Sequence, residues 1–418
     1  MRILPDGLTG AIMAVEGIPD AVTMLHGPGG CRIRHMVVSA AVLPKDVDPG
    51  DSPYYGGYPQ VPATYLDEYD YINGARYKSE EALEDIGARS PSLVVVIDSP
   101  GASLIGDDHL GAIADSDMGR IAMVLADPTA SVPAATMSGR TLRAVMEFLD
   151  PPERRMRRGT VNILGLSLMD KDWRSARDEL RGTAESLGLE VVAMPGAGSS
   201  VAQLVDSVNA EFNIVVCPEM CDGLLEWYES RGVPSVVPPA GAPVGFDATE
   251  AWIRTLADAA GSDPEPALEE VRRCRAIVRE RFIGMRYNAM RIRGLTFSAA
   301  GPASVVRPLT EWLYSYLAMA PEAVVVDEGS DPHHADALEA FLGYIGFGYA
   351  WGREPVPCGA VLCEGIEALE MEAAARCRVG IPIGYSSMGL DDIIPRPIYG
   401  ARGAMYILDE LLHGVRGS

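Results

Sequence analysis

The amino-acid sequence predicts an α/β protein built from three Rossmann-like domains, each with a doubly wound parallel sheet. The chain has 418 residues, which is too long for one ordinary core and fits two to four domains of roughly 100–200 residues. Hydrophobic residues make up 48% and aromatic residues only 7%, a balance that suits parallel sheets covered by helices. Strand-like and helix-like segments alternate along the chain, and we expect domains at residues 1–150, 151–290 and 291–418.

The first expected domain contains a continuous run of mostly β-branched residues at 92–98, which is typical of a buried parallel strand. A second strand is expected at 120–125, and an amphipathic helix at 140–149 closes the domain. Pro151 and Pro152 follow, and because paired prolines stop a helix, a linker is expected here.

The second expected domain repeats a βαβ alternation. Its helix is predicted at 173–187, and its strands at 160–165, 189–193 and 213–217. In open sheets of this kind, ligands bind at the carboxyl ends of the strands. The loop that follows residue 217 is therefore a candidate binding segment.

A long helix at 269–290 is expected to cross from the second domain to the third. The third domain then opens with a Gly-rich strand at 294–301, followed by a helix at 305–317 and a strand at 323–327. The order again predicts parallel strands joined by crossover helices.

The net charge of −23 repels phosphate backbones and anionic membrane surfaces, so neither nucleic acid nor a membrane is expected as a partner. None of the three lysines lies in a Walker-type loop, and ATP is not expected to bind this chain. The sequence shows no signal peptide and no apolar run of ~20 residues, which predicts a cytoplasmic protein. Seven cysteines in that compartment indicate thiols or metal ligands rather than disulfides.

Three segments in order resemble motifs of the nitrogenase component 1-type oxidoreductase family. Residues 26–31, His-Gly-Pro-Gly-Gly-Cys, resemble the H-G-P-x-G-C loop in which the family's cysteine ligates an iron–sulfur cluster. Residues 74–83 resemble its G-x-x-K-x-L segment, and residues 104–108 resemble its I-G-D-D loop. Shorter similarities follow at 213–217, 232–234, 243–245, 380–382 and 399–404.

The resemblance implies three Rossmann-like domains of the nitrogenase component 1 kind and a pseudo-symmetric core of two subunits. It also implies an ATP-dependent iron–sulfur reductase that delivers electrons to a bound substrate or cofactor. Known relatives include dark-operative protochlorophyllide reductase and nickel-tetrapyrrole reductive cyclase. The substrate is not selected by the sequence, although the lack of a histidine near residues 386–388 argues against dinitrogen reduction.

The chain departs from the family at two cluster positions. Ser99 and Pro100 stand where the family has Cys-Pro, and no cysteine precedes Cys31. Because a 4Fe–4S cluster takes four cysteines, one Cys31 per subunit cannot hold it. In a homodimer, or with a related subunit, two such cysteines could share a cluster with harder ligands such as Asp6, Asp98 or Ser99. Alternatively, Cys31 is a buried cysteine in a tight turn into a helix.

Cys217 falls where cofactor ligation occurs in the nitrogenase catalytic subunit, which makes it a candidate for binding a metal or substrate. Cys221 lies on the same strand-to-helix loop, where helical N–H groups are expected to favour thiolates. The alternative is that both are small core residues at the end of a strand.

The remaining candidates are expected to be structural. His109 is expected to begin a helix capped by neighbouring carboxylates. His333 and His334 could bind a metal, but an exposed loop is the favoured interpretation. The aromatic segment 51–59 is a surface loop or a lid over a planar ligand. The cysteines predicted to be core or loop thiols are Cys274, Cys358, Cys363 and Cys377.

Two functions stay open: an electron-accepting reductase component, and a non-redox scaffold or small-molecule-binding protein that kept the fold but lost the cluster. In either case the pocket is expected where the three domains converge. Its predicted lining is the loop of Cys31 together with residues 99–103, 217–221 and 385–388.

Overall fold

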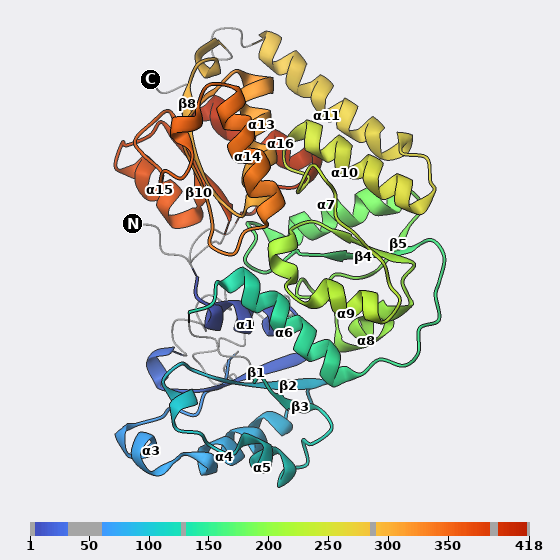
Figure 1. Ribbon diagram of the computed structural model, residues 1–418, viewed down its shortest axis with the longest axis vertical. Helices are drawn as coiled ribbons and strands as arrows, with labels where there is room; N and C mark the ends of the chain where they lie inside the picture. The colour runs from blue at the N-terminus through green and yellow to red at the C-terminus, as the bar shows by residue number, and fades with distance from the viewer. Residues whose placement is uncertain (1–4, 32–60, 127–130, 285–289, 385–391, 416–418) are drawn as a thin grey trace.

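The computed structural model describes residues 5–31, 61–126, 131–284, 290–384 and 392–415. These residues form three parallel sheets, each made from one continuous stretch of the chain (Figure 1). The α/β fold with several parallel sheets, predicted from the sequence, is confirmed. The domain limits stay a prediction.

The first sheet has the strand order β1-β2-β3, and helices cover both of its faces (Figure 1). Its register sets His26 beside Asp98 at the carboxyl ends of β1 and β2. The strand β1 was not predicted. The strands are β1 (Ala21–His26), β2 (Leu93–Asp98) and β3 (Ala122–Val124), and the helices are α1 (Gly7–Glu16), α3 (Glu68–Asn73), α4 (Arg76–Gly87), α5 (His109–Ala114) and α6 (Ala134–Leu149).

The second sheet has the order β5-β4-β6-β7, and its three predicted strands are confirmed within a few residues. Asn162 and Asn213, buried on the central pair, hydrogen-bond to each other at 2.8 Å, which satisfies two polar groups inside the sheet. The elements are β4 (Thr160–Leu164), α7 (Trp173–Ser186), β5 (Glu190–Ala193), α8 (Val201–Asp206), β6 (Phe212–Val215), α9 (Leu224–Ser230), β7 (Ser235–Val236) and α10 (Gly245–Ala260).

The third sheet has the order β11-β10-β8-β9. The predicted strands at 294–301 and 323–327 correspond to β8 and β9, whereas β10 and β11 were not predicted. The elements are β8 (Thr296–Gly301), α13 (Ala303–Leu317), β9 (Ala320–Val326), α14 (Pro332–Tyr344), β10 (Ala360–Glu364), α15 (Gly365–Ala373), β11 (Val379–Gly384) and α16 (Gly400–Gly414).

Helices join the three sheets into one body. The helix α6 packs closely on α1, and a Cβ atom at Gly10 would come within 2.1 Å of the carbonyl oxygen of Ala134. At its other side, α6 contacts the short helix η3 (Pro218–Cys221) that follows β6. The first sheet is therefore coupled to the second through a helix that begins beside the strand ends of the third.

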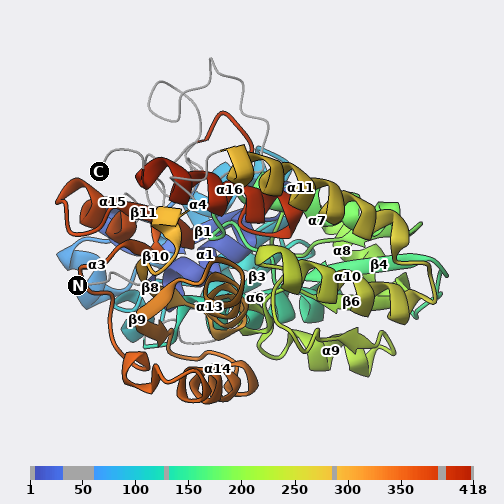
Figure 2. The same cartoon turned by 90° about the horizontal axis from the view of Figure 1, so that it is seen from above.

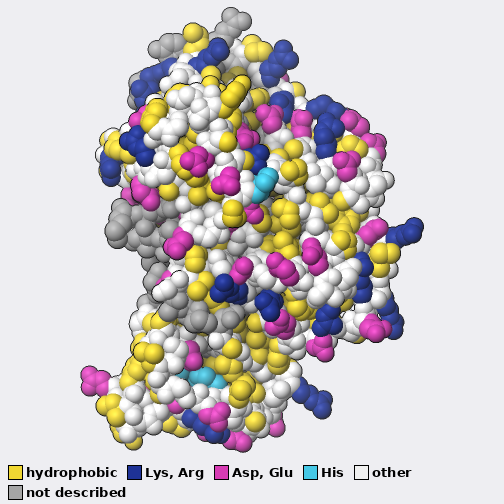
Figure 3. Space-filling model, in the orientation of Figure 1, with side chains coloured by type: hydrophobic (Ala, Val, Ile, Leu, Met, Phe, Trp, Pro, Cys, Tyr) yellow, Lys and Arg dark blue, Asp and Glu magenta, His cyan; other side chains and the backbone are white. Residues whose placement is uncertain are grey.

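The C-terminal helix α16 packs on α7, α10 and α11 (Glu265–Gly284) as well as on β11 (Figure 2). It thus covers elements of both the second and third sheets. On the face drawn in Figure 3, acidic and basic side chains are intermixed. Among the described residues, none of the helices has the length and apolar character needed to cross a bilayer.

Candidate functional site

A cavity of about 460 Å³ lies at the carboxyl ends of strands from the second and third sheets. From the second sheet it is lined by Asp170 and Cys217, which follow β4 and β6. From the third sheet it is lined by residues that end or follow all four strands: Gly301, Asp327, Glu364 and Ile383. Pro133 and Ala134, at the start of α6, complete the junction. The cavity thus lies at strand ends, as predicted for the pocket, but among the described residues no strand end of the first sheet lines it.

Cys217 is a buried thiol that is fixed by its neighbours. Its side chain is 2% exposed, and its Sγ donates to Glu219 Oε2 at 3.2 Å. Burial, followed by the Glu219 carboxylate, raises the pKa of the Cys217 thiol well above its usual value. The prediction that helical N–H groups favour a thiolate here is therefore wrong, because burial and a neighbouring negative charge dominate. Burial also raises the pKa of Cys221.

Glu219 joins the Cys217 loop to the third sheet. Its Oε1 accepts from the backbone N–H of Ser304 at 2.9 Å and of Asp331 at 3.3 Å, and its Oε2 accepts from the Ser304 hydroxyl at 2.6 Å. Ser304 lies in the first turn of α13, where the helix dipole favours an anion. Glu219 lies in the predicted segment 217–221, but no pattern in the sequence indicated its bonds to the third sheet.

Asp170 and Tyr399 form a second polar pair at the cavity. The Tyr399 hydroxyl donates to Asp170 Oδ1 at 2.7 Å, and the backbone N–H of Ser167 donates to Oδ2 at 2.7 Å. Burial raises the pKa of Asp170 to about 6, so this carboxyl titrates close to neutral pH. A cavity-lining acid of that kind is suited to donating or accepting a proton. Tyr399 begins the quoted segment 399–404, but no pattern in the sequence identified Asp170.

The described lining of the cavity is acidic and apolar. Its carboxyl groups are Asp170, Asp327, Glu328 and Glu364, and the described lining contains no lysine, arginine or histidine. The thioethers of Met169 and Met220 and several aliphatic side chains supply the rest of the surface. These walls fit a neutral or cationic ligand better than an anionic one.

The Cys31 loop lies at a different place, at the end of the first sheet. Residues 29–31 are helical, and the half-buried Cys31 packs against the core. Ser99 is buried, and a Cβ atom at Gly27 would come within 2.6 Å of its Oγ. Cys31 and Ser99 both interact with Tyr71. Burial, followed by Cys31, raises the pKa of the Tyr71 hydroxyl, and a hydrogen bond from the Ser99 side chain opposes this shift. Cys31 and Ser99 are thus brought together around one tyrosine.

The two carboxylates named as harder ligands make other contacts. Asp6 caps α1 and accepts from the backbone N–H of Thr9 at 2.9 Å. Asp98 contacts His109 Nε2 through its Oδ1 at 2.9 Å. Neither contact tests ligation of a cluster, so these roles stay predictions.

The predicted lining of the pocket is only partly correct. Cys217 and Met220 line the cavity, whereas Cys31, residues 99–103 and Cys221 are not among its described lining residues. Residues 385–388 and 51–59 lie outside the described part of the chain, although Gly384 does line the cavity.

The other expected structural residues are mostly where the sequence placed them. Asp108 caps α5, of which His109 is the first residue, and Cys274, Cys363 and Cys377 are buried. Cys358 is half-buried. His333 is exposed as expected, but the expected loop is wrong, because both histidines lie in the first turn of α14 and His334 is buried.

Comparisons with known proteins agree with this architecture. A family model described as nitrogenase component 1 type oxidoreductase matches residues 7–415. One subunit of the light-independent protochlorophyllide reductase of Rhodospirillum rubrum is 29% identical over 192 residues, which are 41% of this chain and 35% of that protein. The nitrogenase iron-molybdenum cofactor biosynthesis protein NifE of Clostridium pasteurianum is 23% identical over 276 residues, 65% of this chain and 56% of NifE.

The chain thus spans about a third to just over half the length of these two relatives. Among solved structures, one described as "Nitrogenase Cp1 at pH 6.5" superposes with a TM-score of 0.73 at 16% sequence identity. The superposition covers 99% of this chain and 93% of that one, and it concerns the fold alone.

Proposed function

We propose a reductive function for this chain, which belongs to the nitrogenase component 1 type oxidoreductase family. In this proposal, the chain binds a substrate or cofactor in the cavity beside Cys217 and receives electrons from an ATP-dependent iron–sulfur reductase. It works in a homodimer or with a related subunit. The observation that carries the proposal is the cavity itself, where a fixed thiol and an acid that titrates near neutral pH meet at converging strand ends.

The chain's own contribution to such a reduction is binding and proton transfer. Adding two electrons and two protons to a double bond requires an acid that is partly protonated at working pH, and Asp170 meets that condition. Tyr399 holds the carboxyl in place through a 2.7 Å hydrogen bond. The acidic lining favours a substrate or cofactor that presents neutral or positively charged groups.

An iron–sulfur cluster does not fit the Cys31 loop of one subunit alone. Cys31 is the only cysteine before Cys217 in the sequence, and the neighbouring Ser99 is a hydroxyl rather than a soft thiolate. A cluster at this position therefore requires ligands from a second subunit. No step of the reaction is derived through such a cluster.

Iron and sulfide analysis of the anaerobically purified full chain, with its visible spectrum, tests this proposal. We expect iron and acid-labile sulfide in the dimer, and their loss in Cys31→Ser, while the matched variant Cys358→Ser, also half-buried, retains them. Reductase-dependent electron transfer with Mg-ATP should require the partner, since this chain has no P-loop. Iron-free protein that also fails to accept electrons from any ATP-dependent reductase would exclude the redox role.

The second candidate is a non-redox scaffold or small-molecule-binding protein. It is favoured by Ser99 in place of a family cysteine and by the protonated, hydrogen-bonded state of Cys217. Under this alternative the cavity binds a small molecule, but the protein contains neither iron nor sulfide. The same analysis therefore separates the two functions.

A further inference from the structure

Two histidines lie against each other at the carboxyl end of the first sheet, apart from the cavity. His26 ends β1, and His109 begins α5; their ring centroids are 4.6 Å apart at an interplanar angle of 75°. The chain order of these residues gives no hint of the contact. His26 is fully buried and His109 is 5% exposed, so solvent does not satisfy their ring nitrogens.

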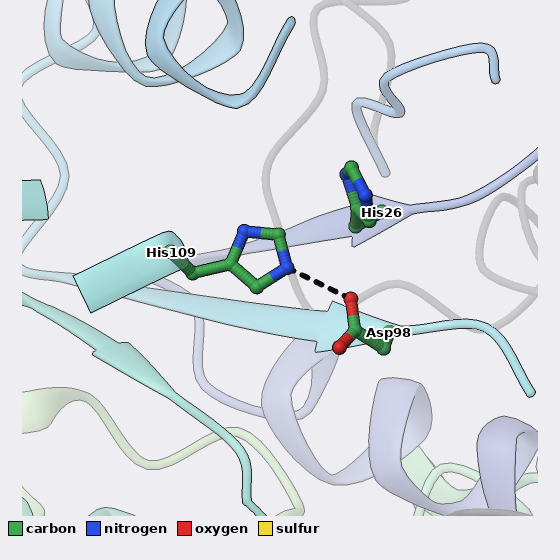
Figure 4. A group of neighbouring side chains, drawn as sticks. All are labelled: His26, Asp98 and His109. Carbon is green, nitrogen blue, oxygen red and sulfur yellow. Dashed lines mark hydrogen bonds and ion pairs between the residues drawn. The ribbon is translucent and has the colours of Figure 1, made fainter. Parts of the chain in front are cut away.

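Each imidazole faces a carboxylate through its Nε2 atom. His109 Nε2 lies 2.9 Å from Asp98 Oδ1, and His26 Nε2 lies 3.0 Å from Asp107 Oδ2 (Figure 4 shows the first pair beside His26). Asp107 is itself held by the backbone N–H of Ala75, at 2.9 and 3.0 Å from its two oxygens. The Asp107 carboxylate is therefore fixed in position beside the His26 ring.

The other nitrogens of both rings converge on one hydroxyl. Ser79 Oγ lies 3.3 Å from His26 Nδ1 and 3.3 Å from His109 Nδ1. If both neutral rings donate from Nε2 to their carboxylates, both Nδ1 atoms are acceptors, but a serine hydroxyl has only one hydrogen to donate. With two neutral rings in these tautomers, one buried Nδ1 is left without a donor, which is costly.

We propose that His26, His109 and Asp98 bind a divalent transition metal ion on the Nε2 side of the two rings. One ligand atom from each of these residues lies within 4.8 Å of the other two. When Nε2 of each ring is a metal ligand, each Nδ1 carries the hydrogen, and the two lone pairs of Ser79 Oγ accept both. The ion thus removes the hydrogen-bonding mismatch, and no net proton transfer is needed between the neutral rings and the ion.

The ligand chemistry identifies the class of ion. Two imidazole nitrogens and one carboxylate oxygen suit Zn²⁺, Fe²⁺ or Co²⁺ rather than Mg²⁺ or Ca²⁺, which prefer oxygen. Ser79 then orients the ligand histidines from behind, as outer hydrogen-bond partners do in metal sites. Asp98, whose side chain is 29% exposed, provides the path of entry from solvent.

A second group of similar composition lacks these features. In the group of Asp331, His333 and His334, the Nδ1 atom of His334 lies 3.2 Å from the guanidinium of Arg307. Asp331 caps α14 through its Oδ1. The neighbouring positive charge opposes a cation at that position, and His333 therefore supplies a matched control.

Cobalt binding to the chelator-treated full chain tests the proposal. We expect one equivalent of Co²⁺, with a visible ligand-field spectrum, to bind and to be displaced by Zn²⁺. Asp98→Asn, which keeps the shape and the hydrogen bond to His109, should weaken binding strongly, and Ser79→Ala should weaken it by about 10–100-fold. His333→Gln should bind as the unmodified chain does, as should Cys31→Ser and Cys217→Ser, which separates this site from any cluster.

The proposal would be overturned by the absence of a Co²⁺ equivalent at this site, or by unchanged Co²⁺ affinity in folded Asp98→Asn and His109→Gln. Melting temperatures show whether each variant is folded. If His109→Gln unfolds, Asp98→Asn and Ser79→Ala carry the test, because both retain most of the packing. A metal-bound histidine ring carries only one proton. If the NMR shifts of the imidazoles show that one ring stays doubly protonated in excess Co²⁺, metal binding is contradicted.

Discussion

The loops after β6 and β1 occupy equivalent positions at the ends of parallel strands, yet they form different environments. After β6, Cys217 faces strands of another sheet, and the space between the sheets is left as a cavity. After β1, His26 faces helices and loops of its own sheet, and side chains fill the space in a chain of hydrogen bonds. A strand end thus becomes a pocket when a second sheet faces it, and a compact polar cluster when its own connections cover it.

The largest effect is expected for Glu219→Ala at the cavity. Removing the carboxylate leaves the Ser304 and Asp331 backbone donors and the Ser304 hydroxyl without their acceptor. Such buried losses should lower the free energy of unfolding by about 4 kcal/mol, measured by urea denaturation. Glu219→Gln preserves the shape and one acceptor oxygen and should cost less. Equal costs for the two variants would mean that the hydrogen bonds of Glu219 do not hold the two sheets together.

The raised pKa of Asp170 predicts that the stability of the folded protein depends on pH. Its pKa rises from 3.8 to about 6 on folding, so its protonated form is favoured in the folded state. The stability from this group is fully present below about pH 4 and is lost as the pH rises through 6, up to about 3 kcal/mol.

Asp170→Asn should remove this dependence. The measurement is the difference in unfolding free energy between the unmodified chain and the variant, from pH 4 to pH 7. Asp172→Asn is the control, because it changes a nearby carboxylate that lies outside the cavity lining. A flat difference for Asp170→Asn across this range would contradict the raised pKa.

Alanine substitutions at two glycines test whether the loop after β6 is more rigid than the loop after β1. A Cβ atom at Gly165, whose φ is +87°, would come within 2.3 Å of the backbone oxygen of Cys217. A Cβ atom at Gly27 would instead meet the side chain of Ser99 at 2.6 Å. Backbone cannot move aside as a side chain does, so Gly165→Ala should destabilise by about 2 kcal/mol more than Gly27→Ala. Thermal unfolding of both variants gives the comparison, and the reverse order would contradict it.

The smallest effect on stability is expected for the cysteines. Cys217→Ser and Cys31→Ser should each change unfolding free energy by roughly 1 kcal/mol or less. Their reactivity should differ clearly, because burial and Glu219 raise the pKa of Cys217, whereas Cys31 is half-buried. Mass spectrometry after iodoacetamide treatment at pH 8 should show Cys31 modified before Cys217. Faster modification of Cys217 would restore the thiolate hypothesis.

The sequence by itself determined the class of fold and the location of the pocket at strand ends. A continuous β-branched run such as 92–98 is sufficient to predict a buried parallel strand, because both faces of such a strand are covered by apolar side chains. Strand β11 was missed because Gly380 and Pro382 are typical of turns. It is an edge strand, where proline is tolerated, and a side chain at Gly380 would come within 1.9 Å of the carbonyl oxygen of Ala368.

The tertiary structure alone decided the protonation and pairing of the polar residues. The pairs Asp170–Tyr399 and Glu219–Ser304 join residues that are far apart in the chain, and no local pattern encodes such contacts. The sequence placed Cys217 correctly at a strand end. The nearby helix start predicted a thiolate, whereas in the folded protein the pKa of the Cys217 thiol is raised. The reason is physical: an ionisation state depends on burial and on every charge nearby, and these are set only when separate sheets pack together.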